Sequence, residues 1–126
     1  MTITSNVQIT IALKDSDLDD EKLQEETENL LQQMRALDEV EDANLVADPN
    51  PPERGKGGGF LLGLLTAEVN AKNIKALFQF LSDRLGGKPI KLALKTPDGR
   101  EINLEASSRE EFEFVMHKAQ DFLKNT

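Results

Sequence analysis

The strongest constraint on the fold is a pair of short runs near the C-terminal end, in which apolar and polar residues alternate. The first run places Ile90, Leu92 and Leu94 on one face, and the second does the same with Ile102 and Leu104. Alternation with a period of two is typical of a strand with one buried face. Between the runs, the sequence TPDGR supplies the proline, aspartate and glycine that tight turns favour. The two runs are therefore predicted to form a β-hairpin.

Five further elements follow from the periodicity of the remaining chain. Alternation predicts a strand over residues 7–13, and a weaker alternation predicts a short strand over 43–47. Apolar residues three and four positions apart predict amphipathic helices that contain 23–37, 74–85 and 112–123. The flanking residues agree with this prediction, because Asp17 can cap the first helix, two glycines follow the second, and a serine-glutamate capping box precedes the third.

A proline- and glycine-rich stretch leads directly into the most apolar run of the chain, FLLGLL. We expect residues 48–59 to form a flexible internal loop, because consecutive glycines leave the backbone unrestrained. The glycines that would act as its hinge are Gly55, Gly57, Gly58 and Gly59. The apolar run that follows, 60–69, is expected to be a helix. Two interpretations of this helix stay open, namely burial in the core and partial exposure for binding.

Together these elements predict a single α+β domain over residues 1–126, with the order β-α-β-(α)-α-β-β-α. The bracketed helix is the apolar run. We expect a two-layer sandwich, in which a mixed four-stranded sheet is covered by helices chiefly on one face. A chain of 126 residues is long enough to bury one hydrophobic core of this kind.

The charge of the chain is strongly uneven. The formal net charge is −8, and the part from 15 to 53 holds fourteen acidic side chains but only two basic ones. Nucleic-acid binding draws its affinity largely from lysine and arginine that neutralise phosphates, so this chain is not expected to bind nucleic acid. We interpret the acidic half as a solvated helix face, with the docking of a basic partner as the alternative.

Composition also bears on the compartment. The chain contains no cysteine, which is compatible with a reducing environment. The first residues lack the basic region, apolar region and cleavage site of a signal peptide. The apolar run is far shorter than the roughly 20 residues that a membrane-spanning helix needs. We therefore expect a cytoplasmic protein without a membrane span.

Patterns that would indicate catalysis or cofactor binding are weak. His117 is the only histidine, so it has no second histidine with which to share a metal. Lys56 precedes the glycines at 57–59, and no serine or threonine follows in the place that a phosphate-binding loop requires. The sequence therefore predicts no enzymatic activity, no cofactor and no metal.

The acidic segment before the first helix has a partial likeness to a calcium loop. Asp15, Asp17, Asp19 and Glu26 occupy its first, third, fifth and twelfth positions, but Asp20 stands where a glycine makes the sharp turn. We favour helix capping as the role of these acids. The alternative function for the chain is small-ligand sensing, of an anion by the glycine-rich loop or of calcium by the acidic loop.

Two aromatic residues fall outside the apolar faces of their predicted helices. At 100° per residue, Phe80 lies about 120° from the centre of its apolar stripe, and Phe114 lies about 160° from that of the last helix. Exposed aromatic residues often contribute to binding surfaces. Together with Phe60, Leu61 and Leu64 of the apolar run, they are the candidate partner-binding residues. Cover by a neighbouring segment is the alternative.

Two segments carry a family resemblance. They are the glycine-led apolar segment at 56–65 and the hairpin at 88–106 with its PDGR turn, and the agreement is looser over 7–47. In these features the chain resembles the bacterial effector-associated constant component family. The resemblance implies a small α+β module found beside variable effectors in bacterial conflict and signalling systems.

The same resemblance implies a coupling role with no chemistry of its own. We therefore expect a non-enzymatic protein-interaction or adaptor module that couples a bacterial effector to its sensor or partner. The expected partner is an effector protein such as a protease or a cell-death domain, and a second copy of the chain is a further candidate.

Overall fold

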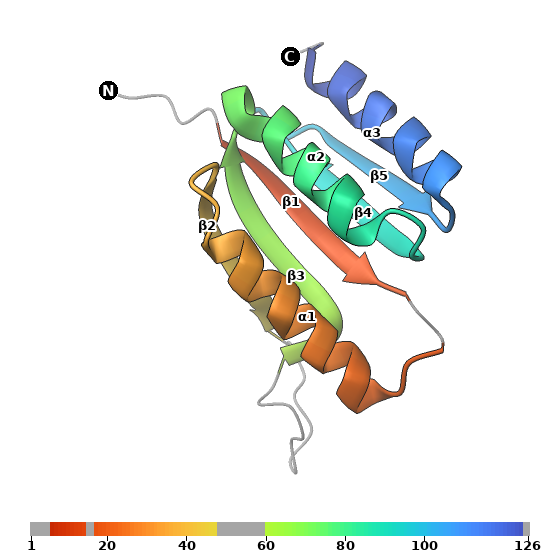
Figure 1. The fold of residues 1–126 in the computed structure, drawn as a ribbon. Helices are drawn as coiled ribbons and strands as arrows, with labels where there is room; N and C mark the ends of the chain where they lie inside the picture. The colour runs from red at the N-terminus through yellow and green to blue at the C-terminus, as the bar shows by residue number, and fades with distance from the viewer. Residues whose placement is uncertain (1–5, 15–16, 48–59, 125–126) are drawn as a thin grey trace.

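The computed structural model describes residues 6–14, 17–47 and 60–124 (Figure 1). Five strands, three α-helices and one short 3₁₀ turn follow one another along these residues. Their order and bounds are β1 (Asn6–Leu13), α1 (Asp20–Arg35), β2 (Val40–Ala47), β3 (Phe60–Asn70), the 3₁₀ turn (Ala71–Asn73), α2 (Ile74–Leu85), β4 (Ile90–Lys95), β5 (Glu101–Ala106) and α3 (Arg109–Lys124).

The five strands form one sheet in the order β2-β3-β1-β4-β5. Every pair of neighbouring strands is antiparallel. Since β1 and β2 are both antiparallel to β3, they run parallel to each other with β3 between them, and α1 connects them. The sheet therefore brings the two halves of the chain together at its centre, where β1 lies between β3 and β4.

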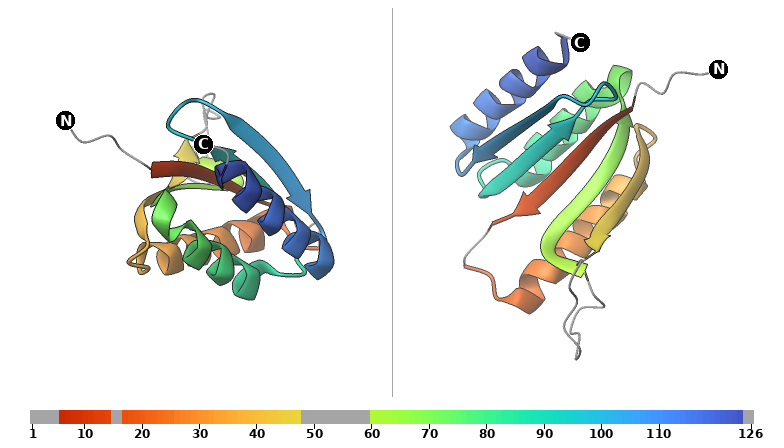
Figure 2. Two further views of the ribbon diagram at one scale, coloured as in Figure 1. Left: turned by 90° about the horizontal axis from the view of Figure 1, so that it is seen from above. Right: turned by 180° about the vertical axis from the view of Figure 1, so that it is seen from behind.

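All three helices cover the same face of the sheet, as the edge-on view in Figure 2 shows. Helix α1 packs on β2 and β3, and α3 packs on β5, with α2 between the two helices. The core lies between the sheet and this helix layer. Its largest fully buried side chains include Ile9, Ile11, Leu30, Leu65, Leu77, Phe78, Leu81, Leu92 and Phe112. None of the helices in the described ranges lies on the opposite face of the sheet, which we call the open face.

The predicted α+β class is confirmed, but three details of the prediction are wrong. The sheet has five strands and not four, and its neighbouring strands are all antiparallel and not mixed. The apolar run predicted to be a helix is instead strand β3. Its strand conformation depends on partners distant in the sequence, because β3 pairs with β1 on one side and with β2 on the other. Such tertiary contacts override the helix preference of leucine.

The burial pattern of β3 answers whether this run is core or surface. Leu65, Ala67 and Val69 are buried under the helices, whereas the neighbouring Leu64 and Thr66 are only half-buried on the open face. One face of this part of the strand thus belongs to the core and the other face points away from it. From residue 63 onward the run therefore contributes to both the core and the surface, because strand residues point alternately to the two sides of a sheet.

The predicted loop at 48–59, with Gly55, Gly57, Gly58 and Gly59, lies outside the described residues. Within the described ranges, no helix is long and apolar enough to cross a membrane.

Candidate functional site

The open face of the sheet is a surface that the helix layer leaves uncovered. The strand register aligns its outward side chains across β3, β1, β4 and β5 in three rows perpendicular to the strands. The middle row is uncharged, and charged residues lie in the rows on either side of it. In strand order, the rows are Glu68-Gln8-Lys95-Glu101, Thr66-Thr10-Ala93-Asn103 and Leu64-Ala12-Lys91-Glu105.

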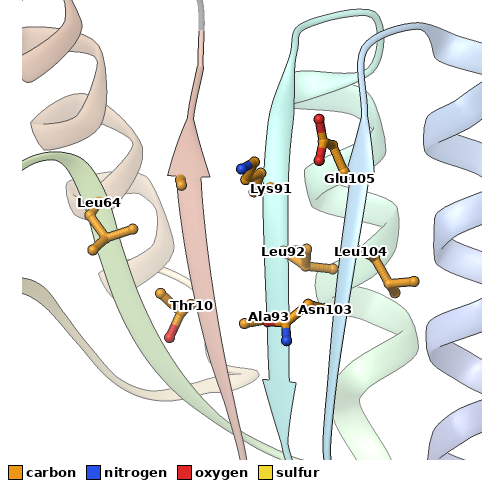
Figure 3. A pocket seen from close by; sticks show the side chains of 9 residues that line it. Thr10, Leu64, Lys91, Leu92, Ala93, Asn103, Leu104 and Glu105 are labelled. Atoms are coloured by element: carbon orange, nitrogen blue, oxygen red, sulfur yellow. The ribbon is translucent and has the colours of Figure 1, made fainter.

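Small side chains at the centre of this face leave a shallow hollow of about 360 Å³. Thr10, Ala12 and Ala93 form its floor, on the neighbouring strands β1 and β4. Figure 3 shows the residues around it, with Leu64 on the β3 side and Lys91 and Glu105 near one end. We call this feature the sheet hollow. Its volume and uncharged floor leave room for a side chain of a binding partner, and its rim provides charges that can orient that partner.

The side chains of the sheet hollow determine which contacts it can make. A lysine and a glutamate stand at its rim, and the floor offers one hydroxyl group and methyl groups. Among the described residues, no group of three or more histidine, cysteine, aspartate or glutamate side chains is placed to hold a metal ion. The hollow can therefore supply contact area, hydrogen bonds and orienting charge.

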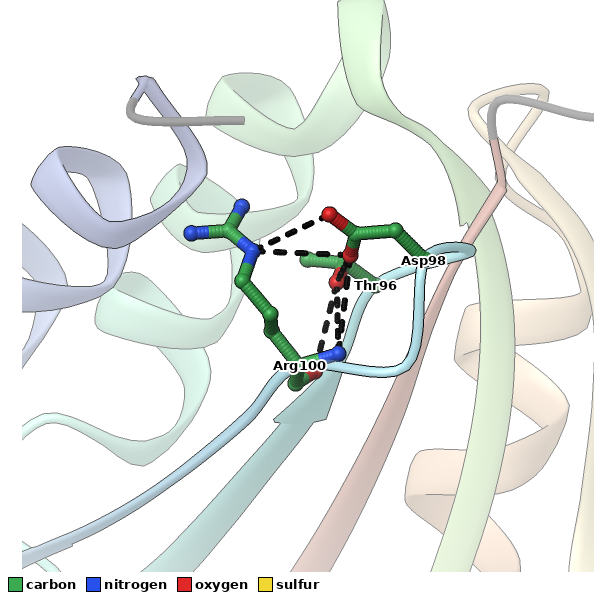
Figure 4. A network of polar contacts seen from close by, with 3 residues as sticks. All are labelled: Thr96, Asp98 and Arg100. Atoms are coloured by element: carbon green, nitrogen blue, oxygen red, sulfur yellow. Dashed lines mark hydrogen bonds and ion pairs between the residues drawn. The ribbon is translucent and has the colours of Figure 1, made fainter.

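A second polar cluster lies at the turn of the β4–β5 hairpin (Figure 4). The buried Thr96 hydroxyl donates to the Asp98 carboxylate and accepts the Arg100 N–H at 3.2 Å. Arg100 Nε lies 3.2 Å from the same carboxylate, and its guanidinium stacks over the Phe122 ring at 4.9 Å. The Thr96 hydrogen bond is the main reason why the pKa of Asp98 is lowered, and Arg100 adds to the effect. These contacts fix the turn and tie it to α3.

The structure describes the side chains of three of the five predicted partner-binding residues, and these three do not share one surface. Leu64 lies at the sheet hollow, on the open face. Phe80 is half-buried and packs against the core, whereas Phe114 on α3 is 61% exposed, in the helix layer. Phe60 and Leu61 begin β3, and their side chains lie outside the described part of the structure. Leu64 and Phe114 therefore occupy opposite sides of the molecule.

The residues of the calcium-loop pattern have structural roles where the structure describes them. Asp19 is the N-cap of α1, and its carboxylate accepts the Lys22 N–H at 2.8 Å. Glu26 lies 3.4 Å from Arg84 Nη2 and 3.8 Å from Lys88 Nζ, so it links α1 to α2. Asp15 lies outside the described residues. These contacts support helix capping and helix packing as the roles of the acids.

His117 lies on the exposed side of α3, where α3 faces α2 across a shallow groove. The groove also carries Lys75, Gln79 and Glu113, and the buried Phe78 lies at its base. The histidine is exposed to solvent.

Sequence reasoning missed the sheet hollow. Its floor residues stand at the polar positions of strands whose apolar positions were identified correctly. The available signal was size, because Thr10, Ala12 and Ala93 are small residues at positions that face away from the core. The alignment of these residues across β1 and β4 could not be read from either strand alone.

Comparison of the chain with protein-family models, with curated proteins and with solved structures finds no match. The resemblance to effector-associated constant component proteins therefore stays a prediction from the sequence.

Proposed function

We propose that this chain is a non-enzymatic protein-interaction module that binds its partner through the open face of its sheet. The carrying observation is the one-sided arrangement of the layers, in which three helices cover one face and leave the sheet hollow on the other. A surface of this kind has an uncharged centre and charged flanks, which is the usual arrangement of a protein-binding surface.

The chemistry of the sheet hollow supports a protein partner. Leu64 is only half-buried at its edge, so a partner's apolar side chain that enters the hollow would cover it. Lys91 and Glu105 lie opposite each other on β4 and β5, close to the same end of the hollow. A partner with complementary charges would therefore bind in one preferred orientation.

The resemblance stated above supports the biological setting of this proposal. A constant component beside variable effectors needs a binding surface and no catalytic groups. We propose that the chain acts in the bacterial cytoplasm and couples an effector, such as a protease or a cell-death domain, to its sensor or partner. Self-association through the same face is the further candidate, since a second copy of the chain and an effector would use the same exposed surface.

A pair of matched arginine substitutions tests this proposal. Ala93→Arg fills the sheet hollow, whereas Ala76→Arg places the same side chain on the exposed surface of α2. Tagged wild-type protein and both variants would be purified from the native cytoplasm, after circular dichroism shows that all three are folded. We expect the wild type and Ala76→Arg to retain a co-purifying effector that Ala93→Arg loses. Equal recovery by both variants would contradict binding through the open face.

A further inference from the structure

Strand β5 forms a regular edge of the sheet. It is the last strand in the order, and all six of its residues pair with β4 without a register shift. No backbone hydrogen bond joins its outer edge to any other part of the chain that the structure describes. A regular edge of this kind presents backbone donors and acceptors that can pair with another strand.

The opposite edge of the sheet is different. The pairing of β2 with β3 shifts register between Val40 and Asp42 and again between Leu45 and Ala47. Irregularities of this type twist an edge strand and oppose the addition of another strand. The two edges are therefore not equivalent, and β5 is the one suited to pairing.

The open face of β5 carries carboxylates that have basic neighbours on one side only. Glu101 and Glu105 lie opposite Lys95 and Lys91 of β4, and none of the described strands lies beyond them. The Lys95 Nζ to Glu101 Oε1 distance is 4.0 Å, and both side chains are more than half exposed, so this pair holds the carboxylate only weakly. An added strand with basic residues at these positions would place a cation on the second side of each glutamate.

The helix-facing side of β5 is incompletely covered. Ile102 and Leu104 are only half-buried, although their partners on β4, Leu94 and Leu92, are 0% and 1% exposed. The helix layer therefore covers the apolar side chains of β5 less completely than those of β4. An added strand with apolar residues opposite Ile102 and Leu104 would complete their burial.

We infer that the outer edge of β5 is a docking site for an extended segment of a partner protein in which basic and apolar residues alternate. Backbone hydrogen bonds to β5 would hold the segment, and the two sets of side chains would fix its register. This inference rests on the proposed function, because it names a segment of the protein partner. It uses the edge of the sheet beside the sheet hollow, and Glu105 belongs to both.

A second copy of the chain fits this edge less well. In an antiparallel pairing of two β5 strands centred on Asn103, Glu101 of each copy would lie directly opposite Glu105 of the other. Like charges that face each other across strands are destabilising. A segment of different sequence, with lysine or arginine at these positions, avoids this repulsion.

The test uses purified full-length protein and a synthetic octapeptide of alternating lysine and valine, with an alternating glutamate-valine octapeptide for comparison. Fluorescence anisotropy should show binding of the basic peptide only, and amide spectra should shift along β5. The variant Glu101→Lys/Glu105→Lys should weaken binding of the basic peptide about tenfold and favour the acidic one, since two cross-strand charge pairs are reversed. The matched control Glu21→Lys/Glu28→Lys changes the net charge equally on the exposed surface of α1 and should bind like the wild type.

Peptides methylated at every second backbone nitrogen distinguish strand pairing from general charge attraction. Two such peptides are possible, one methylated at the odd-numbered and one at the even-numbered nitrogens. If the segment pairs with β5, only one of these two sets of N–H groups faces β5, so methylation of that set should abolish binding and methylation of the other set should leave it intact. Equal binding of both phases, or equal weakening by both charge variants, would overturn the inference. A concentration-dependent dimer formed through β5 would also overturn it, because the occupant would then be a second copy. If peptide binding fails while Ala93→Arg still releases the partner, the proposed function stands without this docking site.

Discussion

Gly63 shows how one residue constrains the approach of three elements. It has a φ of +72°, a conformation that residues with a side chain rarely adopt. A Cβ atom at this position would lie 3.0 Å from the Leu13 carbonyl oxygen and 3.1 Å from Leu23 Cδ2. Strand β3 therefore passes close to the end of β1 and to α1 at a point where only glycine fits. The glycine that interrupts the apolar run is thus a packing requirement.

We predict that Gly63→Ala lowers the free energy of unfolding by about 1–3 kcal/mol, because it combines backbone strain with crowding. Urea unfolding would measure the loss, and amide spectra should shift at Leu13 and Leu23. Gly87→Ala is the control, since Gly87 also has a positive φ, of +96°, but no atom lies within 4 Å of an added Cβ. Unchanged stability of Gly63→Ala would contradict the close approach.

Asp98 gives a pH dependence with a defined sign. Its pKa is lowered from 3.8, chiefly by the Thr96 hydroxyl. A carboxylate with a lower pKa in the folded state contributes stability above its unfolded pKa and loses it as the pH falls through the folded value. The stability difference between the wild type and Asp98→Asn should therefore be constant near neutral pH and shrink below about pH 4.

The same contact can be tested by titration. Thr96→Val removes the hydroxyl from a buried position with little change of shape and should raise the pKa of Asp98 toward its ordinary value. Carboxyl NMR titration of Asp98 in the wild type and the variant would measure the change. An unchanged Asp98 titration would show that the hydrogen bond does not form in solution.

At the level of elements, local sequence signals were sufficient where an element depends on its own residues. The hairpin, α2 and α3 follow the predicted periodicity, and the capping box is present, with the Ser108 hydroxyl accepting the Glu111 N–H at 3.2 Å. The cap of α1 lies at Asp19, although Asp17 was the expected cap. Two acids spaced two residues apart gave the same signal, so the sequence could not distinguish them.

Strand β3 was mispredicted because its structure is fixed by contacts outside the segment. Its run of leucines satisfies a helix as well as a strand. The distinguishing signal lay further along, where Leu65, Ala67 and Val69 alternate with more polar residues and are buried. Strand pairing with β1 and β2 then decides between the two conformations.

The contact between α1 and α2 yields a prediction at this scale. Arg84 Nε donates to Gln33 Oε1 at 2.9 Å, and Arg84 Nη2 lies 3.4 Å from Glu26. We predict that Arg84→Ala lowers the free energy of unfolding by about 1–2 kcal/mol. The substitution removes a hydrogen bond, an ion pair and the packing contacts of a side chain that is only 26% exposed.

Lys22→Ala is the matched control for this prediction. Its ion pair with Glu25 is within α1, and both side chains are more than half exposed. Exposed pairs of this kind contribute little, so we expect a change of at most about 0.5 kcal/mol. Equal losses in the two variants, measured by urea unfolding, would contradict the role of Arg84 in joining the helices.

For the whole molecule, the sequence indicated the two layers but not the order of the strands. Strand β1 pairs with β3 and β4, which lie far from it along the chain, so the central pairings leave no local signal. The sheet hollow also depends on strand pairing between distant parts of the chain. Thr10, Ala93 and Asn103 become neighbours only through the register of β1, β4 and β5. The candidate surface is thus a product of topology, which explains why residue-by-residue reasoning favoured aromatic residues on the helices.

The central claim is that a protein partner contacts the open face. The most direct measurement is photo-crosslinking in the native cells, with benzoylphenylalanine placed at position 8, on the open face beside the sheet hollow, or at position 76, on the exposed surface of α2. We expect one discrete crosslinked protein from position 8 and none from position 76. Crosslinks from position 76 alone, or the same products from both positions, would contradict binding through the open face.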